Sequence, residues 1–414
     1  MNRFLHKLYL AAALSLLVTA GCASAGKQLM GDPRSPYPLQ AKPKVGEIAH
    51  LPTGTVVDFA QMASVAGDAR VVYVGETHDN PASHRLELQI LQGLDRLHPG
   101  RQALGMEMFS RSQQPALDRW VAGKLDEKSF LKESRWYDNW HMDFAYYRDL
   151  LIFARDRHIP VIALNTEKNL VDAVRAKPMN QLSAKEKADL PEMDLADPYQ
   201  RAMVKAVFGD HIHGDMMLDD FVRAQTLWDE TMAESVARYL ASPAGKDRHL
   251  MVVAGGYHVE YGFGIPRRAF RRLPASYVRV GGREIDVPAE KQKEMMNVNL
   301  PEFPMLPYDF LVYLAYESLP ETLRLGVVVE PAQKAKGLLV KGVAPGSNAE
   351  RAGIREGDLL LSLDGEPLAD NMDLIYAVKR KHAGDRDTVL LRRDGRDLKV
   401  EVIFLAAGAE KQHK

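Results

Sequence analysis

The stretch VVYVGETHDN, residues 71–80, decides the fold class. Its first four residues are β-branched or aromatic, which is typical of a buried strand, and the run leads directly into Gly75, Glu76 and His78. Asn80 and Pro81 then begin a helical pattern, because Asn is a favoured N-cap and Pro fits the first helical turn. A buried strand followed at once by a helix indicates an α/β fold with a parallel sheet.

The same alternation continues along the chain. Further strands are predicted at QALGMEM (102–108), IPVIALN (159–165) and HLMVVAG (249–255), and DFLVYLAY (309–316) could return as a last strand. Long amphipathic helices are predicted after residue 80 and over 218–240. We therefore expect a largely parallel sheet flanked by helices, in a domain that spans residues 51–318.

Polar residues follow each predicted strand, at the edge where open parallel sheets bind their ligands. They include Glu76, His78, Glu107 and His258, with Asn165 after the third strand. Two imidazoles and two carboxylates suit a divalent transition metal ion, or general acid and base chemistry without a metal. A single polar residue of this kind would be interpreted as an ordinary polar end of a strand. Because such residues follow several different strands, we favour a functional site.

Two other stretches carry ligand-type residues. RWYDNWHMDFAYYRDLL (135–151) is rich in aromatic residues, which usually form core, and its alternative role is a wall for haem, whose iron accepts His or Tyr. GDHIHGDMM (209–217) places His211 and His213 in a polar segment that reads as a solvated loop.

The first residues form a secretory signal, predicted to be residues 1–22, with Arg3 and Lys7 before an apolar run that is too short to span a bilayer. LLVTAGC (16–22) resembles a bacterial lipobox, and Cys22 is the single cysteine of the 414 residues. We expect Cys22 to be lipidated and to anchor the protein. Ala23 favours the outer membrane, with the protein facing the periplasm. Residues 23–50, rich in Pro, Gly and Lys, are predicted to be a linker.

Composition excludes little else. The net charge of −1 gives no general attraction to nucleic acid, and a single cysteine excludes an intramolecular disulfide or a multi-cysteine metal site. The proline-punctuated segment NVNLPEFPMLPYDF (297–310) precedes a second, small and mainly β domain, predicted at residues 319–407 with a tail at 408–414.

Five stretches in the first domain resemble the ChaN family of iron-regulated, haem-binding bacterial lipoproteins. They are VGETHDNPASHRLELQIL, LGMEMFSRSQQPALDRW, ESRWYDNWHMDFAYYRDLLIFARDRHIPVIALN, FVRAQTLWDETMA and VVAGGYHVEYGFGIPRR. The family belongs to a superfamily with the Tiki metalloproteases and the erythromycin esterases. Its shared pattern is a pair of G-x-x-H motifs, here Gly75 to His78 and Gly255 to His258, with Glu76 and Glu107.

The resemblance implies two alternative functions. The first is haem or iron binding for uptake, with a tyrosine as haem ligand, a histidine assisting, and a homodimer that shares stacked haems. Cofactor-binding candidates are then His78, Tyr147, Tyr257 and His258. The second is a metal-dependent hydrolase acting on a peptide or an ester. Its catalytic and metal-binding residues would be Glu76, His78, Glu107 and His258.

The C-terminal domain resembles PDZ domains of bacterial proteases, through LRLGVVV (323–329), GLLVKGVAPGSNAERAGIREGDLLLSLDGEPL (337–368) and VLLRRDG (389–395). Such domains bind an extended chain end by adding it to a sheet as a strand. The resemblance implies that Leu325, Gly326 and Val327 form the carboxylate loop. The helix that opens at ADNMDLIYAV (369–378) would then form the other wall, and the partner would be a protein or peptide.

Overall fold

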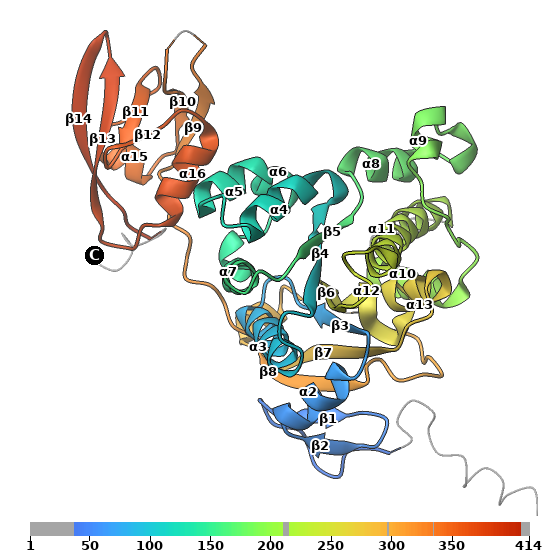
Figure 1. Ribbon diagram of the computed structural model, residues 1–414. Coiled ribbons are helices and arrows are strands. Elements are labelled where there is room, and N and C mark those ends of the chain that lie inside the picture. Colours follow the sequence, from blue (N-terminus) through green and yellow to red (C-terminus); the bar gives the residue numbers. More distant parts are fainter. Residues whose placement is uncertain (1–36, 210–214, 296–297, 334, 407–414) are drawn as a thin grey trace, which may run out of the picture. The chain divides into compact units, whose positions relative to one another are not determined.

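The computed structural model describes residues 37–209, 215–295, 298–333 and 335–406 (Figure 1). The predicted signal peptide with Cys22, residues 23–36 of the predicted linker, His211, His213 and the tail lie outside these residues. The described chain forms two compact units. The first runs to Lys124 and resumes over Trp136–Glu317; the second takes Leu125–Arg135 and the residues from Ser318 onward.

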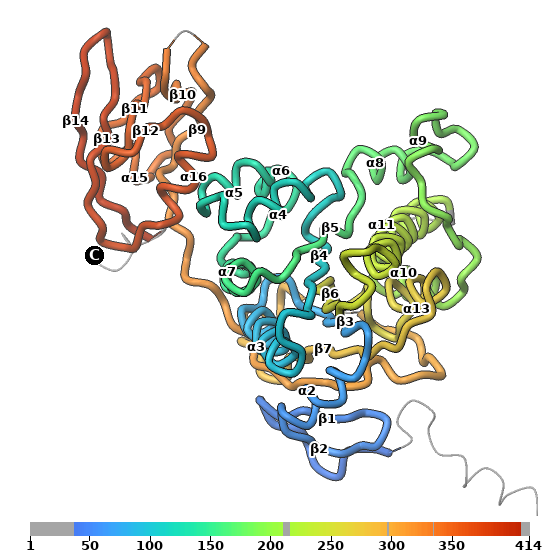
Figure 2. The backbone as a smooth tube through the Cα atoms, viewed as in Figure 1, coloured from blue at the N-terminus to red at the C-terminus, as the bar shows by residue number. Residues whose placement is uncertain are grey.

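The first unit is built on one eight-stranded sheet in the order β2-β1-β8-β7-β3-β6-β4-β5. The five strands from β7 to β5 and the β7–β8 pair run parallel, whereas β1 is antiparallel to both of its neighbours. The strands are β1 (Ile48–His50), β2 (Thr55–Val57), β3 (Val71–Glu76), β4 (Gln102–Ser110), β5 (Val161–Asn165), β6 (His249–Gly255), β7 (Tyr277–Asp286) and β8 (Phe310–Ala315). The tube in Figure 2 shows β3 beside β6 and β7, although β3 ends at Glu76 and the other two begin only at His249 and Tyr277.

Helices cover both faces of this sheet, with α3 and α7 on one side and α10, α11 and α13 on the other (Figure 1). The helices of the first unit are α2 (Phe59–Gly67), α3 (Pro81–Leu97), α4 (Gln114–Val121), α6 (Trp136–Asn139), α7 (Arg148–Asp156), α8 (Lys168–Ala176), α9 (Ala184–Ala188), α10 (Pro198–Phe208), α11 (Asp215–Ala241), α12 (Gly256–Val259), α13 (Ile265–Arg272) and α14 (Ala289–Gln292). All six residues of β3 are buried. Coverage on both faces explains why the parallel strands read as continuous apolar runs.

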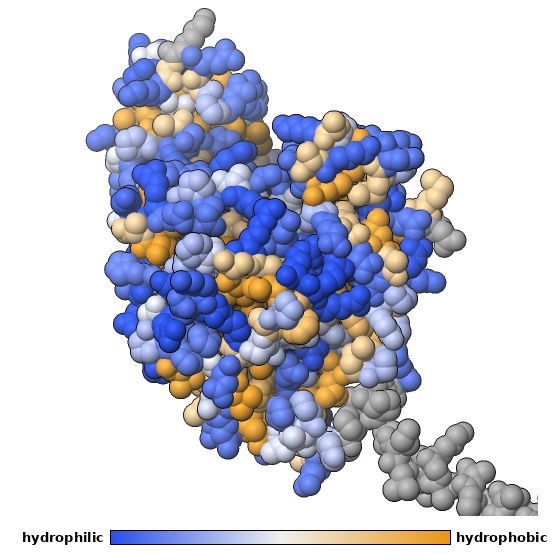
Figure 3. Space-filling view, turned by 45° about the vertical axis from the view of Figure 1, so that its right-hand side comes forward, coloured by the Kyte–Doolittle hydropathy of each residue, from blue (hydrophilic) through white to orange (hydrophobic). Residues whose placement is uncertain are grey.

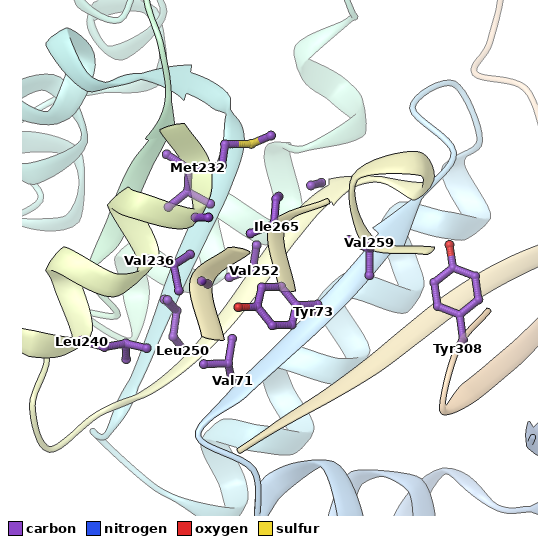
Figure 4. Close-up of a cluster of buried hydrophobic side chains, with 14 of the residues drawn as sticks. Val71, Tyr73, Met232, Val236, Leu240, Leu250, Val252, Val259, Ile265 and Tyr308 are labelled. Atoms are coloured by element: carbon purple, nitrogen blue, oxygen red, sulfur yellow. The ribbon is translucent and has the colours of Figure 1, made fainter. Parts of the chain in front are cut away.

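The core lies between α11 and the sheet. Figure 4 shows Met232 and Val236 of α11 directed towards the strands, near Leu250 of β6 and Val71 of β3. Each of these side chains is at most 2% exposed, and full burial of such a residue contributes about 1.5–3 kcal/mol. This packing fixes the position of α11 against the sheet.

Asn80 links the end of β3 to the neighbouring strands. Its side chain caps α3 by accepting from the Ala82 amide at 3.0 Å, as predicted, and its amide nitrogen donates to Glu284 and to the Ala315 carbonyl. Asn80 is completely buried. A buried amide satisfied on both sides holds the turn after β3 in one conformation.

The first-domain boundaries differ from the sequence prediction in two places. The linker was expected to reach residue 50, but Ile48–His50 form β1, because their backbone pairs with β8. Residues 125–135 were placed in the first domain, yet they group with the second unit, where Lys128 and Lys132 of α5 (Glu127–Glu133) pair with Asp373.

The second unit carries a sheet in the order β14-β13-β11-β10-β9, with β12 paired to β11. Its elements are β9 (Val327–Pro331), β10 (Leu338–Val343), α15 (Asn348–Arg351), β11 (Leu359–Leu363), β12 (Glu366–Pro367), α16 (Asn371–Lys379), β13 (Arg386–Arg393) and β14 (Arg396–Ile403). A separate apolar core that includes Leu338, Leu360 and Phe404 stabilises it. The prediction of a small, mainly β domain is confirmed.

None of the helices in the described ranges is long and apolar enough to cross a membrane. On the face seen in Figure 3, hydrophobic residues form patches among hydrophilic ones.

Candidate functional site

The parallel register brings the predicted strand ends together. Glu76 at the end of β3 lies opposite Gly255 at the end of β6, and Met106 of β4 lies opposite Val253 of the same strand. Glu107, the next residue of β4, therefore lies within one residue of the level of Glu76 and Gly255 along the strands. All three strands deliver their polar residues to one edge of the sheet, as the sequence predicts for a parallel arrangement.

Glu76 and His78 form the first pair of the site. Nδ1 of His78 lies 2.5 Å from Oε1 of Glu76, and the hydroxyl of Tyr147 donates to the same oxygen at 2.8 Å. The Glu76 side chain is fully buried, whereas that of His78 is 38% exposed. A buried carboxylate thus fixes the ring of His78 through Nδ1, and its Nε2 lies against Gly255 at the end of β6.

His258 forms the second pair, from α12. Its Nε2 lies 3.3 Å from Oε1 of Glu107, and its Nδ1 lies 2.6 Å from Oδ1 of Asp229 on α11. The other Glu107 oxygen accepts from the Gly255 amide at 2.7 Å. His258 is therefore held between two carboxylates, one of which comes from a helix.

These contacts set opposite pKa directions for the second pair. Burial alone would lower the pKa of His258, but the charges of Glu107 and Asp229 outweigh it and raise that pKa well above its ordinary value. Burial alone would raise the pKa of Glu107, but the charge of His258 and the hydrogen bonds to it lower that pKa to about 2. Both groups are therefore charged at neutral pH.

In the first pair, the pKa of Glu76 lies close to neutral pH. Burial, followed by the neighbouring Glu87, raises the pKa of Glu76 to about 7. Burial would lower the pKa of His78, but the hydrogen bond and the charge of Glu76 raise it to about 9. Glu76 is thus the group of this pair that changes protonation near neutrality.

Two glycines allow the elements to approach this closely. A Cβ on Gly255 would lie 2.8 Å from Nε2 of His78, and a Cβ on Gly75 would lie 2.8 Å from the hydroxyl of Tyr308. Neither position has room for a side chain without displacing its neighbour. This explains in physical terms why each of the two motifs has glycine at its first position.

Sequence reasoning missed three residues of this region. Asp229 of α11 is 1% exposed and orients His258. His84 and Glu87 of α3 lie behind Glu76. Nδ1 of His84 is 3.4 Å from Oε2 of Glu76 and 3.3 Å from Oε2 of Glu87. All three sit on helices that were read only for their apolar faces. The available signal was polar residues at helical spacing on those buried faces, such as Gln225 and Asp229.

Other predicted residues have different positions. Asn165 donates to the Glu107 carbonyl at 3.0 Å and so supports the site, whereas Glu167 accepts from Ser110 and Ser112 at the end of β4. Arg111, which follows β4 directly, pairs with Glu234 of α11. The aromatic cluster is largely core, since Trp136, Phe144 and Tyr147 are each at most 3% exposed.

Two cavities open beside these pairs, and His258 lines both. The larger, of about 790 Å³, is lined by apolar residues such as Met203, Val207 and Phe263 and by His78 and Tyr257. The smaller, of about 450 Å³, is lined by Glu107, Asn165, Trp140 and His141. The larger cavity falls within the range of about 300–1,000 Å³ that is typical of sites for small organic ligands.

The two candidate tyrosine ligands differ in access. Tyr257 lines the larger cavity and is 36% exposed, and burial followed by Glu260 raises its pKa above the ordinary value. Tyr147 is completely buried, lines neither cavity, and has its hydroxyl bonded to Glu76. Only Tyr257 of this pair faces space that a ligand could occupy.

In the second unit, the predicted carboxylate loop lies before β9. Gly326 has φ +85°, and a Cβ there would lie 2.2 Å from the side chain of Ser347, so only glycine fits. Leu325 is buried in the core, and Val327 begins β9. Within the described residues β9 pairs only with β10, and α16 packs near β9. Each of these two elements carries an exposed apolar side chain: Val328 of β9 is 66% exposed and Ile375 of α16 is 37% exposed.

Comparisons with known proteins agree with this geometry. The model of the family described as haem-binding uptake, Tiki superfamily, ChaN matches residues 62–269, and a PDZ domain model matches residues 324–404. The solved structure described as cofacial heme binding to ChaN of Campylobacter jejuni aligns with a TM-score of 0.51 at 16% identity, covering 68% of this chain and 100% of that one. At this identity the alignment shows a shared fold.

Curated relatives match the C-terminal region. The periplasmic pH-dependent serine endoprotease DegQ of Escherichia coli is 36% identical over 67 residues, and a probable DegP-like endoprotease of Marinomonas is 32% identical over 73 residues. These matches cover 16% and 18% of this chain and only 15% and 16% of those relatives. From the fold, the paired motifs and the matched models together, the chain belongs to the haem-binding uptake, Tiki superfamily, ChaN family and carries a C-terminal PDZ domain.

Proposed function

We propose that the first unit binds haem in the larger cavity. The observation that carries the proposal is a cavity with apolar walls that is lined by two imidazoles, His78 and His258, and by Tyr257, the most exposed of its three lining tyrosines. A flat apolar ring with an iron that accepts oxygen or nitrogen ligands matches both the walls and the donors. Family membership supports the same ligand class.

Tyr257 is the proposed iron ligand. It lines the cavity and is partly exposed, whereas Tyr147 would have to give up its bond to buried Glu76 before it could bind iron. His78, with its side chain 38% exposed, is the proposed assisting histidine. His258 is less accessible, because its ring is enclosed by Glu107 and Asp229.

The lining also offers charge for the two carboxylates of haem. Arg283 and Lys291 both line the larger cavity. Lys291 already pairs with Asp79 at 2.6 Å, while Arg283 is exposed and makes no ion pair within the described residues. Arg283 is therefore the stronger candidate for binding a haem carboxylate, because a guanidinium can bind a carboxylate through two hydrogen bonds.

The setting of this activity is part of the same proposal. A lipid on Cys22 would hold the protein at the bacterial envelope, on the outer membrane facing the periplasm, where it would take part in iron or haem uptake. An extracytoplasmic location agrees with the family and with the periplasmic relatives of the PDZ region. Binding as a homodimer with stacked haems follows from the family resemblance.

The PDZ domain is proposed to dock a protein C-terminus or an extended peptide. β9 has a free edge among the described residues, and α16 provides a second wall. An added strand would form backbone hydrogen bonds with β9 and place its last residue near Gly326. Val328 and Ile375 are exposed apolar residues on these two elements.

The test is a haemin titration of the purified full chain, followed in the Soret region beside metal analysis. Saturable binding is expected, and Arg283→Glu should weaken it at least tenfold because it replaces an attractive charge by a repulsive one. Arg201→Glu, at a surface ion pair outside the cavity lining, is the matched control and should have no effect. Absence of saturable binding in the unmodified chain would refute the proposal.

One observation favours the second candidate, a metal-dependent hydrolase. Both His78 and His258 have a carboxylate on Nδ1, which is the usual support of a metal-binding imidazole. In the described residues, however, these side chains form two separate pairs, Glu76 with His78 and Glu107 with His258. Neither pair is part of a three-ligand group made from these four residues alone. Chelator-sensitive cleavage of an ester or peptide that is abolished by Glu107→Gln would establish this function.

A further inference from the structure

A second cluster of ligand-type atoms lies behind the site, between β3 and α3. Among the described residues, Glu76, His84 and Glu87 are the group of three whose donor atoms all lie within 4.8 Å of one another. Nδ1 of His84 is 3.4 Å from Oε2 of Glu76 and 3.3 Å from Oε2 of Glu87. The two carboxylates have fully buried side chains and that of His84 is 4% exposed.

The hydrogen bonds around this cluster leave one oxygen of each carboxylate without a partner within the described residues, Oε2 of Glu76 and Oε1 of Glu87. Nε2 of His84 lies 3.0 Å from the His78 carbonyl, which can only accept, so Nε2 carries the proton. In neutral His84 the lone pair of Nδ1 then points at the two carboxylates. Tyr147 and His78 both bond to Oε1 of Glu76, whereas Oε2 of Glu76 has no hydrogen-bond partner within the described part of the chain.

Three acceptors facing one another in a buried place repel unless something positive lies between them. Uncompensated burial of a carboxylate costs several kcal/mol. Nothing in the arrangement supplies a donor to Oε2 of Glu76, and Oε1 of Glu87 is also without a partner among the described residues. When both carboxyl groups are ionised and His84 is neutral, the cluster has two negative charges and a lone pair to be balanced.

We propose that Glu76, His84 and Glu87 bind a divalent transition metal ion. Ligands about 2.0–2.2 Å from a tetrahedral ion lie about 3.3–3.6 Å apart. The distances from Nδ1 of His84 to the carboxylate oxygens of Glu76 and Glu87 are 3.4 and 3.3 Å. Two carboxylates balance the charge of the ion, and one imidazole with two carboxylate oxygens suits Zn, Mn, Fe or Co better than Mg or Ca. This set shares only Glu76 with the four residues predicted from the sequence.

The surrounding contacts are those of a supported metal site. The donation from Nε2 of His84 to a carbonyl fixes the tautomer that exposes Nδ1, and Tyr147 and His78 orient Glu76 through its other oxygen. Glu76 also lines the larger cavity, so the cluster lies beside that cavity. The proposal is independent of haem, so it is tested without haemin.

The experiment uses Zn²⁺ as the probe. The full chain, stripped with a chelator, is titrated with Zn²⁺ by calorimetry, and one tightly bound equivalent is expected. Glu87→Gln keeps the shape of the side chain but removes a ligand charge, and should weaken binding at least about tenfold. Glu107→Gln tests whether the ion belongs to the other histidine pair. Asp219→Asn, at a surface ion pair with Arg201, is the control and should leave this affinity unchanged.

Two results would overturn the proposal. If the unmodified chain binds no Zn²⁺, the cluster holds shared protons instead of an ion. If Glu107→Gln weakens the binding and Glu87→Gln does not, the ion belongs to the pair at His258. Circular dichroism and thermal unfolding of both variants exclude loss of fold as the cause, and the result for the unmodified chain does not depend on any variant.

Discussion

Replacing Asp229 by asparagine tests the proposed role of a helix residue in controlling His258. Asp229 is 1% exposed and its Oδ1 lies 2.6 Å from Nδ1 of His258. Oδ2 accepts from Gln200 and Gln225, so in Asp229→Asn the amide oxygen keeps that place and the new NH₂ group faces His258. The ring can then only accept at Nδ1, which favours the neutral form with the proton on Nε2.

The magnitude follows from the loss of one buried, charge-assisted hydrogen bond. Such a bond contributes about 1.5–3 kcal/mol, and one pKa unit corresponds to about 1.4 kcal/mol. The pKa of His258 should therefore fall by about one to two units in Asp229→Asn. The free energy of unfolding should fall by a similar 1.5–3 kcal/mol at pH values where His258 is charged in the original chain.

The pH dependence has a definite sign. Because the folded-state pKa of His258 is raised, its contribution to stability is complete below the unfolded pKa of about 6.5 and is lost as pH rises through the folded pKa. In Asp229→Asn this decline of the unfolding free energy above pH 6.5 should become shallower. The assay is an NMR titration of the His258 ring together with urea unfolding at a series of pH values.

Asp219→Asn is the matched control on the same helix. Asp219 is half-exposed and pairs with Arg201 at the surface, so its loss should change the unfolding free energy by less than about 1 kcal/mol. An unchanged pKa of His258 in Asp229→Asn, or a loss of stability no larger than in the control, would refute the reasoning.

Three further predictions concern separate features. Gly255→Ala puts a Cβ 2.8 Å from Nε2 of His78, so thermal unfolding should show a loss of about 1–3 kcal/mol; a neutral effect would mean that His78 can move away freely. Since the pKa of Glu107 is lowered to about 2, its stabilisation is present above pH 4.5 and lost as pH falls towards 2, and Glu107→Gln should flatten the acid decline of the unfolding free energy in urea titrations. Ile375→Asp should reduce the affinity for a C-terminal peptide at least tenfold in fluorescence anisotropy with an unchanged melting temperature, because the side chain is partly exposed; equal binding would place the peptide elsewhere.

The strand ends were predictable because they combine two local signals. A continuous apolar run indicates a buried parallel strand, and a polar residue directly after it must lie at the common edge. This reasoning located Glu76, Glu107 and the segment that carries His258. The N-cap at Asn80 followed equally from local sequence.

What the sequence did not predict depends on distant packing. Asp229 and His84 reach the site from helices, where a polar residue on an apolar face has no strand end to mark it. β7 was missed because Gly281 and Gly282 interrupt its apolar pattern, although a Cβ on Gly281 would lie 2.5 Å from the ring of Tyr308. Tyr147 appeared equivalent to Tyr257 until its buried contact with Glu76 was known.

The proposed function is tested most directly by comparing haemin binding to Tyr257→Phe and Tyr147→Phe. Both changes remove one hydroxyl, but only that of Tyr257 lines the larger cavity. In Tyr257→Phe the absorption spectrum of a tyrosinate-bound ferric haem should disappear and affinity should fall at least tenfold, whereas Tyr147→Phe should retain both. Retention of the spectrum in Tyr257→Phe would contradict the proposed ligand, and its loss only in Tyr147→Phe would place the haem against Glu76 instead.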